Sequence, residues 1–464
     1  MSAPAEPRRA VPLGTRIGFG VGDFGFLVVW QGTTLFLMYF YTDVMGIDPV
    51  VAGSIYLAAM VWDAVTDPVI AAMAERTRTR WGRYRPWIAL GAVPFGISFA
   101  LAFSTPGSLP VTPWVWALGT HLLLRTAYTI VSMPFNSMQA RLTSDANERT
   151  VLAAFRMVGA ATGSLAIVVL MPLVVQFFSE RGEAYGYFVA ASLAGALAVA
   201  GLLYCAAAMR EPGADKETAP EQSLLADIAE IPGLFRSNGP LVRVFGVIVI
   251  GSICLGMFGK SVLYHFKYDI GREDLVMVAL VLPAILLVVS TPFWVWLSQR
   301  RSKRDALGIG LIISFAGYLL FFFNPSHYLP GAFAAIALIG LGGASLPVMF
   351  WAMLPDTIEY GEYRSGTRAE SRTFGFATFA QKAAVGINAL LLGALLSWSG
   401  FEANADQLPS TLLAMKAIMV LVPAAGSIAI LGILRGYHLD RAAHGALVRA
   451  LDARRKASML ARTE

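Results

Sequence analysis

Two acidic residues lie in the middle of an apolar run of the sequence. The stretch AAMVWDAVTDPVI, residues 58–70, contains Asp63 and Asp67, four residues apart. In a helix, side chains at this spacing share one face, with Cβ atoms about 5–6 Å apart. Two ionised carboxylates at that separation repel each other, and an apolar surrounding makes each charge costly. A proton or a metal cation bound between them relieves both costs, so the pair predicts a cation site.

Two structural alternatives to a cation site stay open for these acids. Each carboxylate could pair with an arginine of another helix, or it could remain protonated as a hydrogen-bond donor. Hydroxyl groups favour the cation site, because hard cations such as Na⁺ prefer oxygen ligands. We therefore expect cation binding by Asp63, Asp67, Thr66, Thr129 and Ser132. If the cation is Na⁺, the two carboxylates are its metal ligands.

The composition places these residues in a membrane protein. The chain has 464 residues, of which 56% are hydrophobic and only 14% charged, and its mean hydropathy is +0.61. An ordinary soluble domain carries about 25% charged residues. Apolar runs long enough to cross a bilayer as a helix recur along the whole chain. We predict an all-α membrane protein with about twelve transmembrane helices, at residues 17–42, 50–74, 87–105, 112–138, 151–178, 186–209, 241–266, 275–297, 306–323, 330–353, 373–399 and 411–434.

The loops between these runs predict the topology. Arginine-rich loops follow the second and the eighth run, ERTRTRWGRYRP and SQRRSKRD, whereas the alternate loops are mostly acidic or uncharged. By the positive-inside rule, this bias places both termini in the cytoplasm. The first apolar run has no small-residue cleavage site, so we expect a retained helix and not a removable signal peptide. The net charge of +6 then reflects membrane orientation and not nucleic-acid binding.

The longest polar stretch divides the chain into two halves of six runs. Its composition is typical of a cytoplasmic linker, at residues 211–240. We predict an N-terminal half at 1–210, a C-terminal half at 241–436 and a cytoplasmic amphipathic tail at 437–464. This division is expected of major facilitator transporters, although the sequence repeat is weak. The apolar residues of the tail are spaced for a helix, which either lies along the inner leaflet or is solvated.

Several short motifs together resemble one family of transporters. They are GFGVGDFG followed by WQ, YTDVMGI, WDAVTDPVIAAMAERTRTRWGRYRPWI, YTIVSMPFNSM, and IEYGEYRSGTRAES followed by Lys382. Over residues 14–436 they resemble the glycoside–pentoside–hexuronide:cation symporters, the melibiose permease-like family of the major facilitator superfamily. The block with the paired aspartates and its arginine-rich tail is the most specific of these pieces.

The resemblance implies roles for the residues of the cation site. Asp63 and Asp67 match the family's carboxylates for the coupling cation. Thr66 stands where melibiose permease has an asparagine that helps to choose the cation, and Thr129 matches a threonine near that site. The resemblance therefore implies that solute movement is coupled to a cation, Na⁺ or H⁺.

The resemblance also implies a rebuilt sugar site. Leu27 and Ser132 replace two aspartates that bind the sugar in melibiose permease, and Asn136 replaces a tryptophan that stacks on it. Arg156 matches a sugar-site arginine of the family, and Lys382 matches a lysine of the cation and substrate region. Melibiose itself therefore does not follow as the substrate.

A sugar site needs an aromatic surface and several hydrogen-bonding side chains near the middle of the membrane. The predicted substrate-binding residues are Trp30, Gln31, Tyr128, Asn136, Arg156, Thr378 and Lys382. Arg125 also lies within an apolar run, where it either has a structural role or indicates an anionic substrate. The excess of positive side chains suits a carboxylated sugar such as a hexuronide.

Charged residues in the loop after the tenth run predict a cytoplasmic gate. Ion pairs among Glu362, Arg368 and Glu370 could close the inner face while the outer face is open. The expected function is sugar symport by alternating access, in which a cation neutralises the paired acids and raises the affinity for the sugar. By linkage, the sugar must then raise the affinity for the cation.

Two other functions are alternatives to sugar symport. A lipid, lysolipid or other organic-anion symporter on the same fold would explain the altered sugar contacts. An intramembrane enzyme is less favoured, because the histidines at 121, 265, 327, 438 and 444 form no metal motif and Cys205 and Cys254 lie apart in apolar runs. We expect no enzyme activity and no cofactor beyond the coupling cation. The expected partners are a small sugar or sugar acid and the lipid bilayer, with no nucleic acid and no obligatory protein partner. We expect a monomer in a bacterial-type inner membrane.

Overall fold

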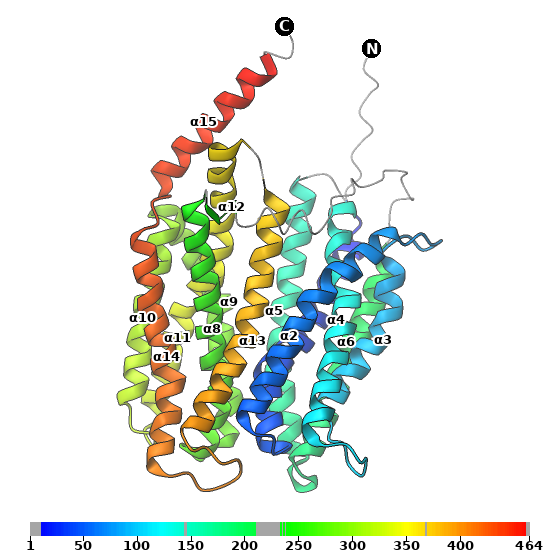
Figure 1. The fold of residues 1–464 in the computed structure, drawn as a ribbon, viewed down its shortest axis with the longest axis vertical. Coiled ribbons are helices and arrows are strands. Elements are labelled where there is room, and N and C mark those ends of the chain that lie inside the picture. Colours follow the sequence, from blue (N-terminus) through cyan, green and yellow to red (C-terminus); the bar gives the residue numbers. More distant parts are fainter. Residues whose placement is uncertain are drawn as a thin grey trace. The chain divides into compact units, whose positions relative to one another are not determined.

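The computed structural model describes residues 11–142, 146–209, 233, 235–236, 238–366 and 369–460. In these ranges the ordered elements are helices, apart from a β-bridge between Thr79 and Gly82. The chain divides into two compact units (Figure 1). The first comprises Met1–Ala219 and Ala389–Asp406, and the second comprises Pro220–Asn388 and Gln407–Glu464. Most of the predicted linker, 211–240, lies outside the described residues.

Long helices in the first unit coincide with the first six predicted runs, which confirms the all-α prediction there. The first run also ends in a π-helical turn, Phe40–Val44. The helices are α1 (Leu13–Tyr39), α2 (Pro49–Arg76), α3 (Arg85–Ala102), α4 (Pro113–Leu142), α5 (Ala146–Phe177) and α6 (Glu183–Ala208).

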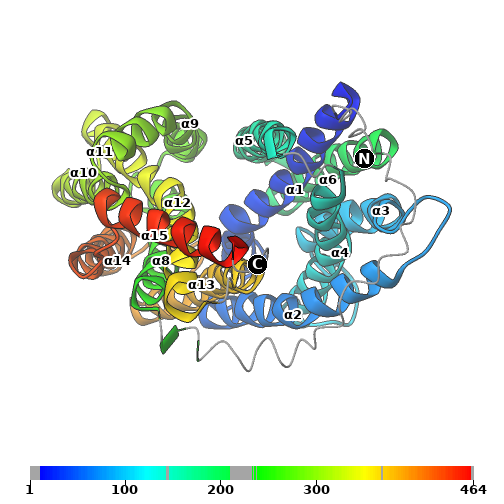
Figure 2. The same ribbon diagram turned by 90° about the horizontal axis from the view of Figure 1, so that it is seen from above.

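Small residues let the helices of the first unit pack closely. In the view from above, α1 lies beside α5 and α6 (Figure 2). Helix α2 packs on α4, and α3 packs on both α4 and α6. A Cβ at Gly159 of α5 would collide with the carbonyl oxygen of Gly20 of α1, and one at Gly163 would collide with that of Phe24. The pair Gly159 and Gly163 is a small-xxx-small motif, which brings two helix backbones together in a membrane. This crossing fixes which side chains of α1 and α5 face each other.

Long helices in the second unit coincide with the remaining runs. The tenth run is divided at Ala344 into two helices, α11 and α12, and the predicted tail contains a further helix, α15. The elements are α8 (Gly239–Tyr268), α9 (Val276–Arg300), α10 (Lys303–Phe323), α11 (Leu329–Gly343), α12 (Ser345–Ser365), α13 (Glu370–Trp398), α14 (Pro409–Arg435) and α15 (Arg441–Leu460). From Ala389 onward, α13 belongs to the first unit.

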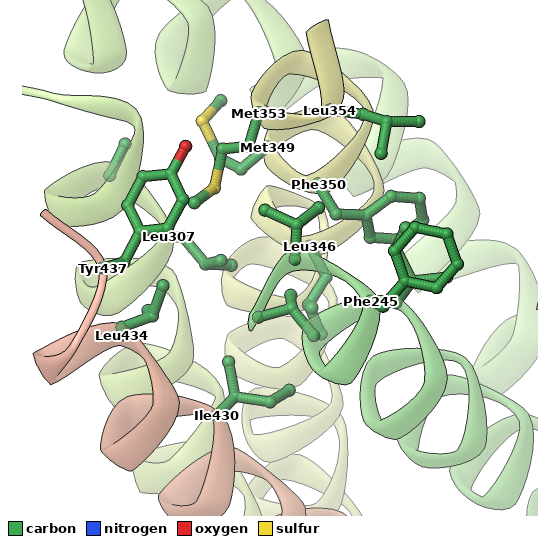
Figure 3. Packing of buried hydrophobic residues seen from close by; sticks show 14 of the residues in the cluster. Phe245, Leu307, Leu346, Met349, Phe350, Met353, Leu354, Ile430, Leu434 and Tyr437 are labelled. Atoms are coloured by element: carbon green, nitrogen blue, oxygen red, sulfur yellow. The ribbon is translucent and has the colours of Figure 1, made fainter. Parts of the chain in front are cut away.

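A buried apolar cluster holds the second unit together at one end of its helices. It combines residues of α8, α10, α12 and α14, among them Phe245, Leu307, Met349 and Ile430 (Figure 3). Tyr437, just beyond α14, also belongs to it, and Leu447 of α15 packs against it. The tail helix therefore docks on the protein through apolar contacts, at the end of α12.

The same helix pairings recur in both units, although the sequence repeat is weak. In the first unit α1 packs on α6, α3 on α6, α2 on α4 and α3 on α4. In the second unit the corresponding pairs are α8 with α14, α10 with α14, α9 with α11 and α10 with α11. A repeated six-helix unit is the architecture expected of a major facilitator transporter.

Eleven helical segments among the described residues are long and apolar enough to cross a membrane. Helix α4 is not one of them, although it coincides with the predicted run 112–138. Its length is sufficient, but polar side chains such as His121, Arg125 and Asn136 lower its hydropathy. A helix that carries so many polar groups at membrane depth is expected to serve a function inside the protein.

Candidate functional site

The paired acids of α2 converge on one hydroxyl group of α4. Thr129 Oγ1 lies 2.9 Å from Oδ1 of Asp63 and 2.9 Å from Oδ1 of Asp67. The sequence thus predicted correctly that the two acids share one helix face and that Thr129 lies near them. Asp63 and Thr129 are both fully buried, whereas Asp67 is partly exposed.

A single hydroxyl cannot satisfy both carboxylates in the same way. Thr129 has one O–H hydrogen, so it can donate to one carboxylate at a time. The second oxygen–oxygen contact at 2.9 Å then needs a proton on the carboxyl group, a cation beside the two oxygens or a positive side chain next to them. The geometry therefore favours an additional positive charge at the pair, which is the chemistry of a coupling-cation site.

The two other predicted cation ligands occupy different positions. The Thr66 hydroxyl donates to backbone carbonyls of its own helix, at 3.0 Å to Trp62 and 3.3 Å to Asp63. Its oxygen still carries lone pairs that could face a cation. Ser132 is buried, and its Oγ has no hydrogen-bond partner in the described part of the chain. Their roles as ligands stay predictions.

A second charged group links α1, α4 and α5. Arg156 of α5 makes an ion pair with Asp23 of α1 through Nε, and its Nη2 lies 3.2 Å from Asp23 Oδ1. The same Nη2 donates to Asn136 Oδ1 of α4 at 2.9 Å. The guanidinium also lies over the ring of Phe135, 4.9 Å from its centroid. The structure thus joins two predicted substrate residues, Asn136 and Arg156, in one network.

Asp23 is a member of this network that sequence reasoning missed. It is a buried acid of α1, three residues after Gly20, and Gly20 is where α1 crosses α5 most closely. Arg156 precedes Gly159, the glycine on the other side of that crossing, by the same spacing. The sequence feature that could have indicated Asp23 is an acid inside an apolar run with glycines nearby.

Aromatic rings of α1, α3 and α4 pack together beside these charges. The ring centroids of Trp30 and Tyr128 lie 5.7 Å apart. Tyr128 also contacts Phe26 at 5.7 Å and Phe95 at 5.9 Å. Rings of this kind provide the apolar face that a sugar ring stacks on. Gln31 follows Trp30 in α1 and is partly buried.

The remaining predicted substrate residues lie in the other unit. Thr378 and Lys382 belong to the part of α13 that is assigned to the second unit. The Thr378 hydroxyl donates to the Phe374 carbonyl at 3.0 Å, and Lys382 is 7% exposed. Their participation in substrate binding stays a prediction.

The predicted gate residues flank a gap in the described chain. Glu362 lies in the last turn of α12, and Glu370 lies in the first turn of α13. Arg368 lies outside the described residues. The prediction that the three residues pair is therefore not tested by this structure.

A different charged cluster occupies the same end of α12. Lys303 Nζ lies 2.7 Å from Asp356 Oδ1, and His444 Nε2 of α15 lies 2.6 Å from Glu359 Oε2 and 3.5 Å from Asp356 Oδ1. Arg454 donates to the Tyr363 carbonyl at 2.9 Å. The tail helix is therefore held on α12 by polar contacts as well as apolar ones.

Known proteins similar to this chain are transporters. It is 31% identical over 414 residues to the putative glycoside/cation symporter YagG of Escherichia coli, covering 88% of each chain. It is 28% identical to the isoprimeverose transporter of Lactiplantibacillus pentosus, covering 90% of this chain and 87% of that one. It is 27% identical to a glucuronide carrier protein homolog of E. coli, covering 95% and 96%.

Solved structures agree on the fold. The nucleoside transporter NupG superposes with a TM-score of 0.68 at 13% identity, covering 92% of this chain and 99% of that one. A bacterial homolog of the lysosomal transporter Spinster gives a TM-score of 0.67, covering 94% and 97%. A family model described as MFS/sugar transport protein matches residues 18–441. With the helical fold of the described residues and the polar groups buried inside it, this match shows that the chain belongs to the MFS/sugar transport protein family.

Proposed function

We propose that this protein is a secondary active sugar symporter, in which a cation bound at Asp63 and Asp67 drives the uptake of a glycoside, pentoside or hexuronide. The single observation that carries the proposal is the contact of both carboxylates with the one hydroxyl of Thr129. Relatives named as a glycoside/cation symporter and an isoprimeverose transporter support a sugar as the solute. These names also favour a sugar over a lipid, and transport over enzyme activity.

The coupling follows from the cost of the paired charges. Without a cation, the two carboxylates repel each other and Thr129 can neutralise neither. A bound Na⁺ or H⁺ removes the repulsion and fixes the facing sides of α2 and α4. The sugar-binding side chains of α4 then become ordered, so the cation raises the affinity for the sugar. By linkage, the sugar raises the affinity for the cation by the same factor.

The substrate site proposed here uses the network and the rings of the first unit. Arg156, held by Asp23 and Asn136, can donate to sugar hydroxyls, and the Trp30 and Tyr128 rings can lie against the sugar ring. We also propose that Thr378 and Lys382 of the second unit bind substrate. We further propose that both termini are cytoplasmic, that the protein acts as a monomer, and that it lies in a bacterial inner membrane.

Uptake into proteoliposomes tests this function. The wild-type protein should accumulate a labelled sugar from a panel of methyl glycosides, pentosides and hexuronates when an inward Na⁺ or H⁺ gradient is applied. Asp63→Asn and Asp67→Asn should each reduce this accumulation at least 100-fold, while some sugar exchange persists. Asp274→Asn is the matched control, because Asp274 is an exposed acid that pairs with Arg272 outside the helices α8 and α9. Uphill accumulation by the double Asn variant would contradict the proposal.

A further inference from the structure

Arg125 of α4 is a buried arginine that has no acidic partner. Its side chain is 2% exposed, and no ion pair of the described residues involves it. Its Nε donates to Nε2 of His121 at 3.4 Å, and its Nη2 has no hydrogen-bond partner. A guanidinium is charged at every physiological pH. A buried charge of this kind costs several kcal/mol unless an anion pairs with it.

Two more polar atoms without partners lie in the same region. His121 is fully buried, and because its Nε2 accepts from Arg125, its proton belongs on Nδ1, where it meets no acceptor. Thr34 Oγ1 of α1 is also buried without a partner. The Tyr56 hydroxyl, which donates to the Thr33 carbonyl at 3.1 Å, has both Thr34 and Arg125 as polar neighbours. Arg125 Nη2 and His121 Nδ1 are donors, and the Thr34 hydroxyl can donate, so an acceptor with negative charge would satisfy all three.

Trp30 connects this cluster to the proposed sugar site. The Arg125 guanidinium lies over the Trp30 ring, 5.0 Å from its centroid, and Tyr128 lies 5.7 Å from the same ring. Trp30 and Thr34 are four residues apart on α1, and Arg125 and Thr129 are four apart on α4, so each pair shares a helix face. A ligand ring lying on Trp30 and Tyr128 therefore has donors for an acidic group at one edge.

We propose that Arg125, His121 and Thr34 form an anion site that takes the carboxylate of a sugar acid, and that the transported substrate is a hexuronate. This inference rests on the proposed function and specifies its substrate class. A free inorganic anion such as chloride has the same charge, so the experiment below separates the two sources.

The position of Arg125 also explains how substrate and cation assist each other. Its positive charge lies one helical turn from Thr129, which contacts both acids of the cation site. It therefore repels a cation while the anion site is empty. A bound carboxylate neutralises it and removes that repulsion. Repulsion between two unit charges at an effective dielectric constant of about 20 is expected to change the cation affinity about tenfold.

Binding to the purified protein in detergent tests the anion site without requiring transport. Glucuronate should bind at least tenfold more tightly than its neutral methyl ester, measured by calorimetry. Arg125→Gln should abolish this preference, and Arg125→Lys should keep part of it. Lys416→Gln should not change it; Lys416 is a buried cation of the second unit whose Nζ donates to the Asn324 carbonyl at 2.6 Å. Equal binding of acid and ester would overturn the proposal, and so would a preference that survives Arg125→Gln. Displacement of bound glucuronate by an equal concentration of chloride would also overturn it.

A second measurement separates a binding role from a merely structural one. In the absence of sugar, Arg125→Gln should tighten the cation affinity of the acid pair about tenfold, whereas a variant that only damages folding would weaken it. Failure of this inference is also distinct from failure of the proposed function. Uphill uptake of a neutral sugar together with indifference to the acid would leave symport standing and remove the anion site. If no sugar, neutral or acidic, accumulates or binds, both the proposed symport and the anion site are wrong.

Discussion

The two units of this protein bury charge in opposite ways. In the first unit, Asp63 and Asp67 share one hydroxyl, and the hydrogen-bonding neighbours of Arg125 are the uncharged side chains of His121 and Tyr56. Among the described residues, Nη2 of Arg125 has no hydrogen-bond partner. An intramembrane charge that the protein leaves incompletely satisfied is costly, and this cost is typical of a functional site.

In the second unit, neutral oxygens accept hydrogen bonds from two of the buried cations. Lys260 is fully buried and donates to Asn388 Oδ1 at 2.8 Å, while the Asn388 amide donates to the Ile253 carbonyl at 2.9 Å. Lys416 donates to the Asn324 carbonyl. These contacts need no ligand. The comparison teaches that a buried charge indicates a binding site only when its partners leave something unsatisfied.

Breaking the Asp23–Arg156 pair should produce the largest effect, because it removes an ion pair between α1 and α5 whose acid is buried. Another ion pair between these helices, Arg16–Glu148, is partly exposed at both side chains. Arg156→Gln leaves the Asp23 carboxylate buried and unpaired, which is expected to cost about 3 kcal/mol of stability and to reduce sugar binding at least 100-fold. Thermal unfolding in detergent and sugar binding by calorimetry measure the two effects.

The double variant Asp23→Asn with Arg156→Gln measures how much of the stability comes from the interaction between the two side chains and how much from each side chain alone. We expect a coupling free energy on the order of 1–3 kcal/mol between the two substitutions. Stability should recover in part, because no charge is left unpaired, but sugar binding should not. Additive effects on stability would mean that the two side chains do not support each other.

The polar contact of Lys260 should matter for stability and not for coupling. Lys260→Met leaves the Asn388 oxygen without its donor, so we expect a loss of about 1–3 kcal/mol. Adding Asn388→Leu should restore most of this loss, because well-packed apolar side chains replace a buried polar pair at little cost. The apparent cation affinity should be unchanged in both variants. A change in cation dependence would show that the second unit also holds a coupling charge.

The sequence predicted the helices well because the bilayer sets their length. Each apolar run became a helix, and the spacing of Asp63 and Asp67 placed them on one face toward Thr129. The division of the tenth run at Ala344 was missed, since apolar composition does not reveal a break between two helices. It lies among small residues, where Gly342 packs against the carbonyl of Gly310.

The partners of single charges could not be predicted from the sequence. Asp23 was overlooked because its partner, Arg156, lies more than a hundred residues away and meets it only through the glycine crossing of α1 and α5. The open alternatives for Arg125 likewise depended on which atoms surround it. The structure supplies those atoms, and none of the described ones is a carboxylate in contact with it.

The contacts of α15 should give the smallest effect, because they are partly exposed. His444 and Glu359 are about a quarter exposed, at 28% and 27%, so His444→Ala should cost less than about 1 kcal/mol. Arg454→Ala, which also removes a contact with the Tyr363 ring at 4.3 Å, should have a similar cost. The expected result is faster hydrogen exchange in α15 with little change in α12, whereas Arg449→Ala, an exposed change on the same helix, should leave exchange as it is. Faster hydrogen exchange throughout α12 would instead mean that the tail helix supports the core of the second unit. The hydrogen bonds of its buried lysines would then also depend on the tail helix.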